Sequence, residues 1–152
     1  TPPLPPAQSK SSPPRKQRCI YWLGSELSKA LVSARPIDRI FSKQFSRVLP
    51  GETVWVIGNR DNRFVSIGFA IVDRVIPAGE QWIITAKAPV TPRLMDLTDE
   101  WKENFTFASK RSLTKENRII PDGRELQSMR ELSVEAGQWL ARRWQEAQHK
   151  GG

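Results

Sequence analysis

The sequence predicts an α+β domain in which a small, barrel-like β-sheet is surrounded by helices. Two apolar runs of strand character, residues 19–23 and 53–57, each contain a tryptophan. The second run opens a series of apolar segments separated by turn-forming residues, which is typical of a strand meander. Stretches with helical spacing of apolar residues lie before and after this series, so we expect helices to pack around the sheet.

The first 18 residues predict a linker. They contain six prolines, several serines and no periodic apolar face, a composition typical of disordered or polyproline II segments. Their basic residues can contact phosphates without sequence preference. Residues 19–150 are enough for one domain with a hydrophobic core.

After the linker, the sequence predicts a strand and two helices. Residues 20–23 form the expected strand, and Ser25 is placed to cap a helix over 26–33. A second helix is expected over 37–48, between two prolines. Its buried stripe has helical spacing and consists of Ile37, Phe41, Phe45 and Val48.

Three basic residues, Arg39, Lys43 and Arg47, share one face of the expected second helix. They lie about 200° around the helix from its apolar stripe, at about 100° per residue. Such a straight row can follow a phosphate backbone. The alternative is ordinary solvated charge.

The meander follows. Residues 53–58 predict a strand, 59–63 a hairpin loop of turn formers, and 64–76 a long strand with a bulge or bend at Gly68. A turn then leads to a third strand over 81–86. A long strand shared between two neighbours suits a barrel in which strands bend from one sheet into the next.

The pattern is weaker in the C-terminal third. Residues 97–107 suggest a short helix, and 107–114 a strand or a loop with a basic patch. A final helix is expected from the cap residue Ser133 to about residue 148. Its buried stripe comprises Ala136, Leu140, Trp144 and Ala147.

Charge and composition narrow the function. The net charge of +8 and the isoelectric point near 10.2 favour a polyanionic partner, nucleic acid above all. The single Cys19 lies in an apolar run, so we expect a buried thiol, no internal disulfide and a cytoplasmic protein. No apolar run is long enough to span a membrane.

Catalytic and metal-binding patterns are missing from the sequence. One histidine and one cysteine exclude a Cys/His metal cluster, and no phosphate-binding glycine loop is present. We therefore expect no metal, no cofactor and no catalysis.

Three short motifs resemble those of EVE domains. The run IYWL at residues 20–23, followed by Ser25 and Glu26, is similar to their opening strand. The run LPGETVWVI at 49–57 resembles their PGD-plus-strand element, with Glu52 in place of the usual aspartate. Residues 66–72 resemble the glycine-containing strand that follows. The resemblance spans about residues 19–76, less than half of the chain.

The resemblance implies a PUA-like pseudo-barrel with helices packed around it. Related EVE, YTH and SRA domains read nucleic acid, often at a modified base. EVE-like modules of prokaryotes are fused to nucleases that restrict modified DNA. It therefore implies a DNA-binding module, with DNA favoured over RNA, that serves as the specificity domain of a larger protein with a fused or associated nuclease.

We expect a base that leaves the stack to enter an aromatic pocket. Trp22 and Trp55 lie on strands that should be neighbours or near-neighbours, and at least one of these two is expected in the core. Trp82 on the returning strand is the third candidate. Ser25 lies where matching family members place a pocket residue, with helix capping as the alternative. The residues expected to contact the nucleic-acid backbone are Arg39, Lys43, Arg47, Asn59, Arg60, Arg63, Lys110 and Arg111.

Two other functions remain open from the sequence. The first is a protein-interaction or structural domain whose tryptophans serve only as core. The second is a small-nucleoside enzyme of the related ASCH type, which needs a Lys–Thr–Glu type of site that we do not identify in the sequence.

Overall fold

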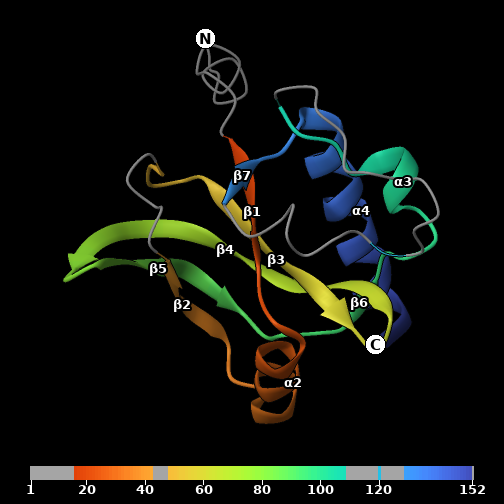
Figure 1. The fold of residues 1–152 in the computed structure, drawn as a ribbon, viewed down its shortest axis with the longest axis horizontal. Coiled ribbons are helices and arrows are strands. Elements are labelled where there is room, and N and C mark those ends of the chain that lie inside the picture. Colours follow the sequence, from red (N-terminus) through yellow and green to blue (C-terminus); the bar gives the residue numbers. More distant parts are fainter. Residues whose placement is uncertain (1–15, 43–47, 109–119, 121–128, 152) are drawn as a thin grey trace, which may run out of the picture.

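The computed structural model describes residues 16–42, 48–108, 120 and 129–151 (Figure 1). Its strands form one mixed sheet of seven strands in the order β2-β5-β4-β3-β1-β7, with β6 paired to β4. The strands are β1 (Gln17–Tyr21), β2 (Ile37–Ser42), β3 (Thr53–Arg60), β4 (Arg63–Ala78), β5 (Gln81–Val90), β6 (Met95–Asp96) and β7 (Arg130–Glu131). The helices are α2 (Gly24–Ser33), α3 (Trp101–Asn104) and α4 (Val134–Gly151).

The sheet is curved and open. The strand β1 runs parallel to β3, and the other described pairings are antiparallel. Within the described residues, the terminal strands β2 and β7 are not paired with each other. Because β7 has only two residues, it offers almost no ladder for closure. Among the residues that the structure describes, the pseudo-barrel that we expected is therefore not closed.

The predicted meander is confirmed, with longer strands than the sequence suggested. The turn between β3 and β4 contains only Asp61 and Asn62, both with positive φ, as a two-residue type I′ hairpin requires. Asn59 and Arg60 therefore end β3, and Arg63 begins β4, instead of forming a five-residue loop.

The predicted irregularity at Gly68 is confirmed as a β-bulge. The register between β3 and β4 shifts between Val56 and Ile57, which leaves one extra residue on β4. Gly68 has a φ of +142°, a conformation that side chains disfavour. A Cβ atom there would also lie 3.1 Å from Cδ1 of Ile37.

The prediction of a helix over 37–48 is wrong. Residues 37–42 form β2, which pairs with β5, and residues 43–47 lie outside the described part of the chain. Ile37 and Ile40 are both buried although they are three residues apart, because a register shift between Ile37 and Arg39 changes the alternation of the strand. This irregularity in the strand thus gives its buried residues a spacing of three, which is also typical of a helix. Arg39 is exposed on β2, and Lys43 and Arg47 are not described.

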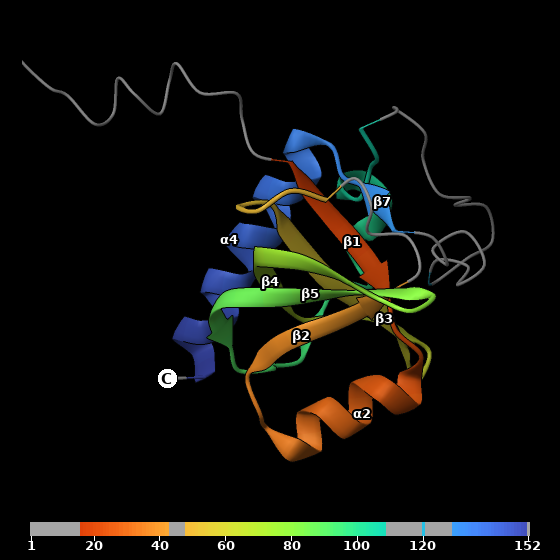
Figure 2. The same cartoon turned by 90° about the vertical axis from the view of Figure 1, so that its left-hand side faces the viewer.

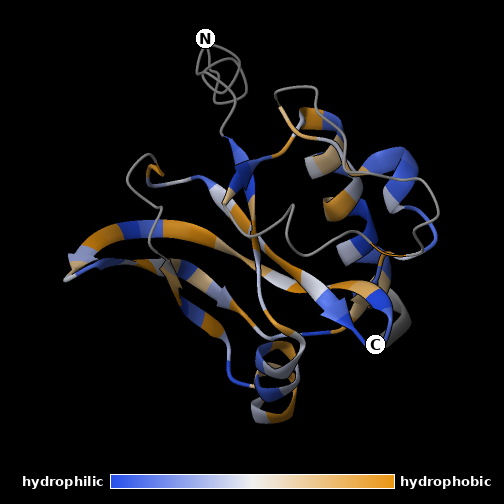
Figure 3. Ribbon diagram, viewed as in Figure 1, coloured by the Kyte–Doolittle hydropathy of each residue, from blue (hydrophilic) through white to orange (hydrophobic). Residues whose placement is uncertain are grey.

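Two hydrophobic clusters lie on opposite faces of the sheet. One cluster packs under α4 and α3 and is rich in rings, among them Trp55, Phe64 and Trp101. The other contains Leu27 of α2 and β-strand residues such as Ile84, and its fully buried members are all aliphatic. Figure 2 shows α4 along one side of the sheet and α2 apart from it, below β2. The central parts of β3 and β4 are accordingly hydrophobic in Figure 3.

The helix caps agree with the sequence only at α4. There Ser133 Oγ accepts a hydrogen bond of 3.0 Å from the backbone N–H of Ala136, as predicted. In α2 the N-cap is Leu23 and no side chain caps the helix, so the cap role of Ser25 is wrong. The helix expected over 97–107 is only four residues long. None of the helices in the described ranges could cross a membrane.

Candidate nucleic-acid interface

The four residues predicted to form a base pocket lie on both faces of the sheet. Trp55 is 2% exposed in the cluster under α4, and its Nε1 donates a 2.8 Å hydrogen bond to Gln17 Oε1. Trp22 and Trp82 are half-buried and pack against the aliphatic cluster instead. Ser25 is exposed on α2. The sheet therefore separates Trp55 from the other two tryptophans, and the role of each in binding stays a prediction.

The predicted hairpin contacts are partly engaged within the protein. Arg60 Nε donates to Ser28 Oγ at 2.9 Å. Arg63 pairs with Asp96 at 2.7 Å and with Asp99 at 4.0 Å. Asn59 is half-buried near the end of β3. Lys110 and Arg111 lie outside the described residues.

The positive charge is unevenly distributed. The described residues hold nearly equal numbers of basic and acidic side chains, so most of the net charge of +8 belongs to segments outside them. On the described surface, a basic side chain that forms no ion pair and lies beside a cavity therefore indicates an anion-binding site more specifically than the overall charge does.

Such a cation borders the cavity that Trp144 of α4 lines. This cavity of about 530 Å³ is formed by residues 89–93, Trp144 and Gln148. A second, smaller cavity of about 210 Å³ shares Trp144 with it. The other residues of the smaller cavity are Gln17, Thr53, Trp55, Phe69, Ala141 and Gln145. We call the two cavities together the Trp144 groove.

Trp144 is held by the sheet beneath it. Its ring meets Phe69 edge to face, with centroids 5.6 Å apart. A Cβ atom on Gly68 would lie 3.5 Å from the indole Cη2, so the glycine lets the ring approach the bulge closely. The indole is 6% exposed, and its Nε1 makes no hydrogen bond within the described part of the chain. The groove thus has an aromatic wall with a spare donor.

Arg93 supplies the charge of the groove. The backbone N–H of Arg93 donates to Ile67 O at 2.9 Å, which fixes the segment between β5 and β6 beside the β4 bulge. Its Nη1 donates to Ala147 O of α4, also at 2.9 Å. Within the described residues Arg93 forms no ion pair, and none of the residues that line the 530 Å³ cavity is acidic. The cavity therefore favours an anionic ligand.

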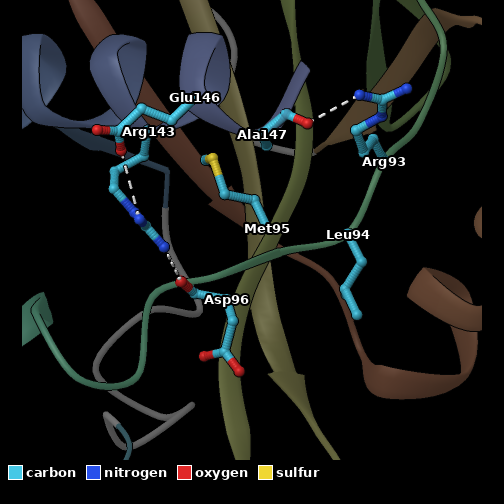
Figure 4. Close-up of a pocket in the computed structure, with 7 residues that line it drawn as sticks. All are labelled: Arg93, Leu94, Met95, Asp96, Arg143, Glu146 and Ala147. Atoms are coloured by element: carbon cyan, nitrogen blue, oxygen red, sulfur yellow. Dashed lines mark hydrogen bonds and ion pairs between the residues drawn. The ribbon is translucent and has the colours of Figure 1, made fainter. Parts of the chain in front are cut away.

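On the other side of Arg93 lies a cavity of about 560 Å³ with a different charge balance (Figure 4). Arg143 crosses it, donating from Nη2 to Asp96 O at 2.8 Å, and its Nη1 lies 3.4 Å from Glu146 and 3.8 Å from Glu100. Its buried Nε has no hydrogen-bond partner in the described structure. Because carboxylates surround this guanidinium, the cavity attracts anions less than the Trp144 groove does.

Asp96 is also stabilised as an anion. Burial by itself would raise the pKa of its carboxyl, but hydrogen bonds from Arg63 and Thr98 outweigh burial and hold that pKa below its ordinary value. Asp96 is therefore charged at neutral pH. Cys19 behaves in the opposite way, because burial raises the pKa of its thiol to about 12 and keeps it neutral. In the described ranges, no group of three or more histidine, cysteine, aspartate or glutamate side chains could hold a metal ion.

Sequence reasoning missed most of the groove. The helical spacing assigns Trp144 to helix packing, and Arg93 and Gln148 carry no recognisable signal in the sequence. The two prolines near Arg93 mark a loop but not its position beside α4. Trp55 is the one predicted pocket residue that lines the Trp144 groove.

Comparisons with known proteins bear on the fold. No family model and no curated protein matches the sequence. The crystal structure of ASCH from Zymomonas mobilis is similar, with a TM-score of 0.52 and 19% identity over 84% of this chain and 95% of that one. A tyrosine-to-phenylalanine mutant of that protein has a TM-score of 0.53 and 18% identity over 84% and 97% of the two chains. A serine-to-alanine mutant of it has a TM-score of 0.53 and 17% identity over 86% and 97%. The chain therefore shares the fold of these ASCH structures, and the likeness does not single out an EVE-type domain.

Proposed function

We propose that this protein binds nucleic acid and that the Trp144 groove receives a base. The observation that carries the proposal is the lining of one cavity, which includes an indole, the Gln148 amide, the Thr91 hydroxyl and no acidic residue. Arg93 also lines it and forms no ion pair within the described residues. The PUA-like fold and the basic composition of the chain support the same conclusion.

The groove has the chemistry that base recognition requires. Its larger cavity of about 530 Å³ lies within the roughly 300–1,000 Å³ of ordinary ligand pockets. Removing a base from its stack costs a few kcal/mol, and contact with aromatic side chains returns about 1–3 kcal/mol per base. Gln148 and Thr91 can donate to and accept from a base edge, while Arg93 holds the adjacent phosphate.

A narrower form of the proposal follows from the resemblance to EVE domains. In this form the ligand is DNA with a modified base, which is flipped into the groove. The domain then acts as the specificity module of a larger protein with a nuclease, and it has no catalysis of its own. The groove supports base binding in general, and the choice of DNA and of the modification is the part that needs the experiment.

The test is a binding measurement with the full chain. Fluorescence anisotropy would compare labelled DNA that carries a modified cytosine or adenine, unmodified DNA and RNA of the same sequence, each at two salt concentrations. We expect salt-dependent binding, with the modified DNA bound most tightly. Equal binding of all three nucleic acids would show that the protein binds phosphate groups without a preference for the base. Absence of binding at low salt would overturn the proposal in favour of a protein-interaction domain.

A second candidate is a small-nucleoside enzyme of the ASCH type. The cavity on the far side of Arg93 favours it, because Asp96 and Glu146 both line that cavity beside Arg143 (Figure 4). Such carboxylates can take part in proton transfer. Incubation with modified nucleosides, followed by chromatography, distinguishes the two functions: product formation identifies the enzyme, and unchanged nucleosides agree with a binding module.

A further inference from the structure

The Trp144 groove continues along α4. A third cavity, of about 350 Å³, shares Gln17 with the smaller part of the groove, just as the two parts of the groove share Trp144. This third cavity is also lined by Gln138 of α4, by Lys16 and by the acidic Glu131. The three cavities therefore follow one another in a row along α4, and Gln17 and Trp144 form the walls between neighbouring cavities.

One stripe of α4 lines the whole row. Gln138, Ala141, Gln145 and Gln148 follow one another at intervals of three or four residues, so they share a face of the helix. Each of them lines one of the three cavities. All four are exposed, and the side chains of the three glutamines make no hydrogen bond in the described part of the chain. Three amides are thus free to bind a ligand.

The row has a cation at each end. Arg93 lies in the cavity that Gln148 lines, and Lys16 in the cavity that Gln138 lines. Lys16 pairs with Glu131 at 3.6 Å, but the lysine side chain is 53% exposed, and ion pairs in such positions contribute little. Lys16 can therefore exchange this partner for a phosphate.

From these observations we propose that the row of cavities binds a single-stranded segment of nucleic acid that runs along α4 from Arg93 to Lys16. The proposal rests on the proposed function and extends it from one base to a tract. Gln138 and Gln148 are ten residues apart, which is about 15 Å along a helix. This length matches roughly four nucleotides at a stacked rise of about 3.4 Å.

The amide stripe argues for a single strand. An amide both donates and accepts hydrogen bonds, so it can pair with the edge of any base. Base edges are free for such contacts in unpaired segments. The smaller middle cavity, of about 210 Å³, admits individual groups of a strand and not the body of a duplex. Recognition along the stripe is therefore tolerant of sequence, whereas the end beside Trp144 selects the base.

Calorimetric titration of the full chain at low salt tests the proposal. The ligands are single-stranded oligodeoxynucleotides of two, four and eight residues, together with an eight-base-pair duplex. We expect affinity to rise roughly tenfold from two to four residues and to change little beyond four. Affinity that is equal for two and four residues, or a duplex bound as tightly as the single strand, would overturn the proposal.

The matched variants separate this inference from the proposed function. The double variant Gln138→Ala, Gln145→Ala should bind the four-residue strand several-fold more weakly and the two-residue strand as the original protein does. Gln81→Ala, at the exposed tip of the β4–β5 hairpin, is the control and should change neither. If the double variant binds like the control, the tract is refuted and base binding at Trp144 stands. If no oligonucleotide of any length binds the original protein, both proposals fail.

Discussion

The two faces of the sheet are packed with different side chains, and the cavities of the proposed site lie on only one of them. Under α4, half of the buried cluster consists of rings, including Trp101, Phe105 and Trp139. On the α2 face, the fully buried residues are aliphatic and mostly β-branched. Small branched side chains fill a curved surface closely, whereas large flat rings meet at steep angles, such as the 82° between Phe69 and Trp144. Both parts of the Trp144 groove lie on the aromatic face.

The comparison also shows that the exposure of a tryptophan does not indicate whether it lines a cavity. Trp22 and Trp82 are more exposed than Trp55, yet they flank the aliphatic cluster. Trp144 is nearly buried and nevertheless lines two cavities. A position at the edge between a helix and the sheet, and not the exposure of its ring, is therefore what gives Trp144 its place in these two cavities.

The largest expected effect concerns the stability of the aromatic face. Trp101 is 0% exposed and meets Phe64 edge to face. Trp101→Ala should lower the free energy of unfolding by about 3–5 kcal/mol, because it removes a large buried ring and leaves a cavity. Urea denaturation measures this change. A loss below about 1 kcal/mol would mean that the aromatic cluster is loosely packed and contributes little to the fold.

The second prediction addresses binding. Arg93→Gln should weaken nucleic-acid binding by about 1.5–3 kcal/mol at low salt, since it removes a charge-assisted hydrogen bond. It should also reduce the slope of log affinity against log salt by about 1. Arg35→Gln, an exposed position beyond α2, is the matched control and should leave binding unchanged. Equal losses in the two variants would show that binding depends on overall charge and not on the Trp144 groove.

On the aliphatic face a smaller change is expected, in stability only. Ile84 is fully buried beside Ile40 and Val75 on neighbouring strands. Ile84→Val should cost about 0.5–1.5 kcal/mol in the free energy of unfolding. Nucleic-acid affinity, measured by anisotropy, should stay the same. A clear loss of affinity would place part of the binding site on this face and contradict the contrast between the two.

The smallest effect is a pH dependence. The pKa of Asp96 lies below its ordinary value of 3.8, so the folded state binds this proton less tightly than the unfolded state does. The resulting stabilisation is present above pH 3.8 and is lost as the pH falls through the lower pKa of the folded protein. Asp96→Asn should remove this part of the acid dependence in thermal unfolding curves recorded between neutral pH and about pH 3. Identical pH profiles for the two proteins would contradict it.

The local features of the fold are predictable from the sequence where a single residue type determines them. Gly68 marks a bulge because only glycine readily adopts its backbone conformation, and Ser133 marks a helix start through its hydroxyl. The spacing of Ile37 and Ile40 misleads, because a bulge in a strand can place residues three apart on one face. The strand at one end of the sheet is not predictable, because β7 has only two residues and no sequence pattern.

The site is harder to predict because it is assembled from distant segments. Gln17 lies on β1, Gln148 on α4 and Arg93 in the segment between β5 and β6, and each is unremarkable in its own stretch of sequence. Hydrophobic periodicity predicts which side of an element faces inward. It does not predict which polar residues of two elements meet at the rim. Trp55 is the exception, because it lies on a strand of clear pattern.

The bulge on β4 also affects which changes in sequence and length the strand can accept. Before it, the odd-numbered Val65 and Ile67 face the aliphatic cluster; after it, the even-numbered Ala70 and Val72 do so. The extra residue therefore resets the alternation halfway along the strand. Without the extra residue the strand would alternate regularly, and Ala70 and Val72 would keep the face they now have. Deleting a residue beyond the bulge would instead turn the rest of β4 over. A change in the length of this strand therefore preserves the surface on which Trp144 rests only at the bulge itself.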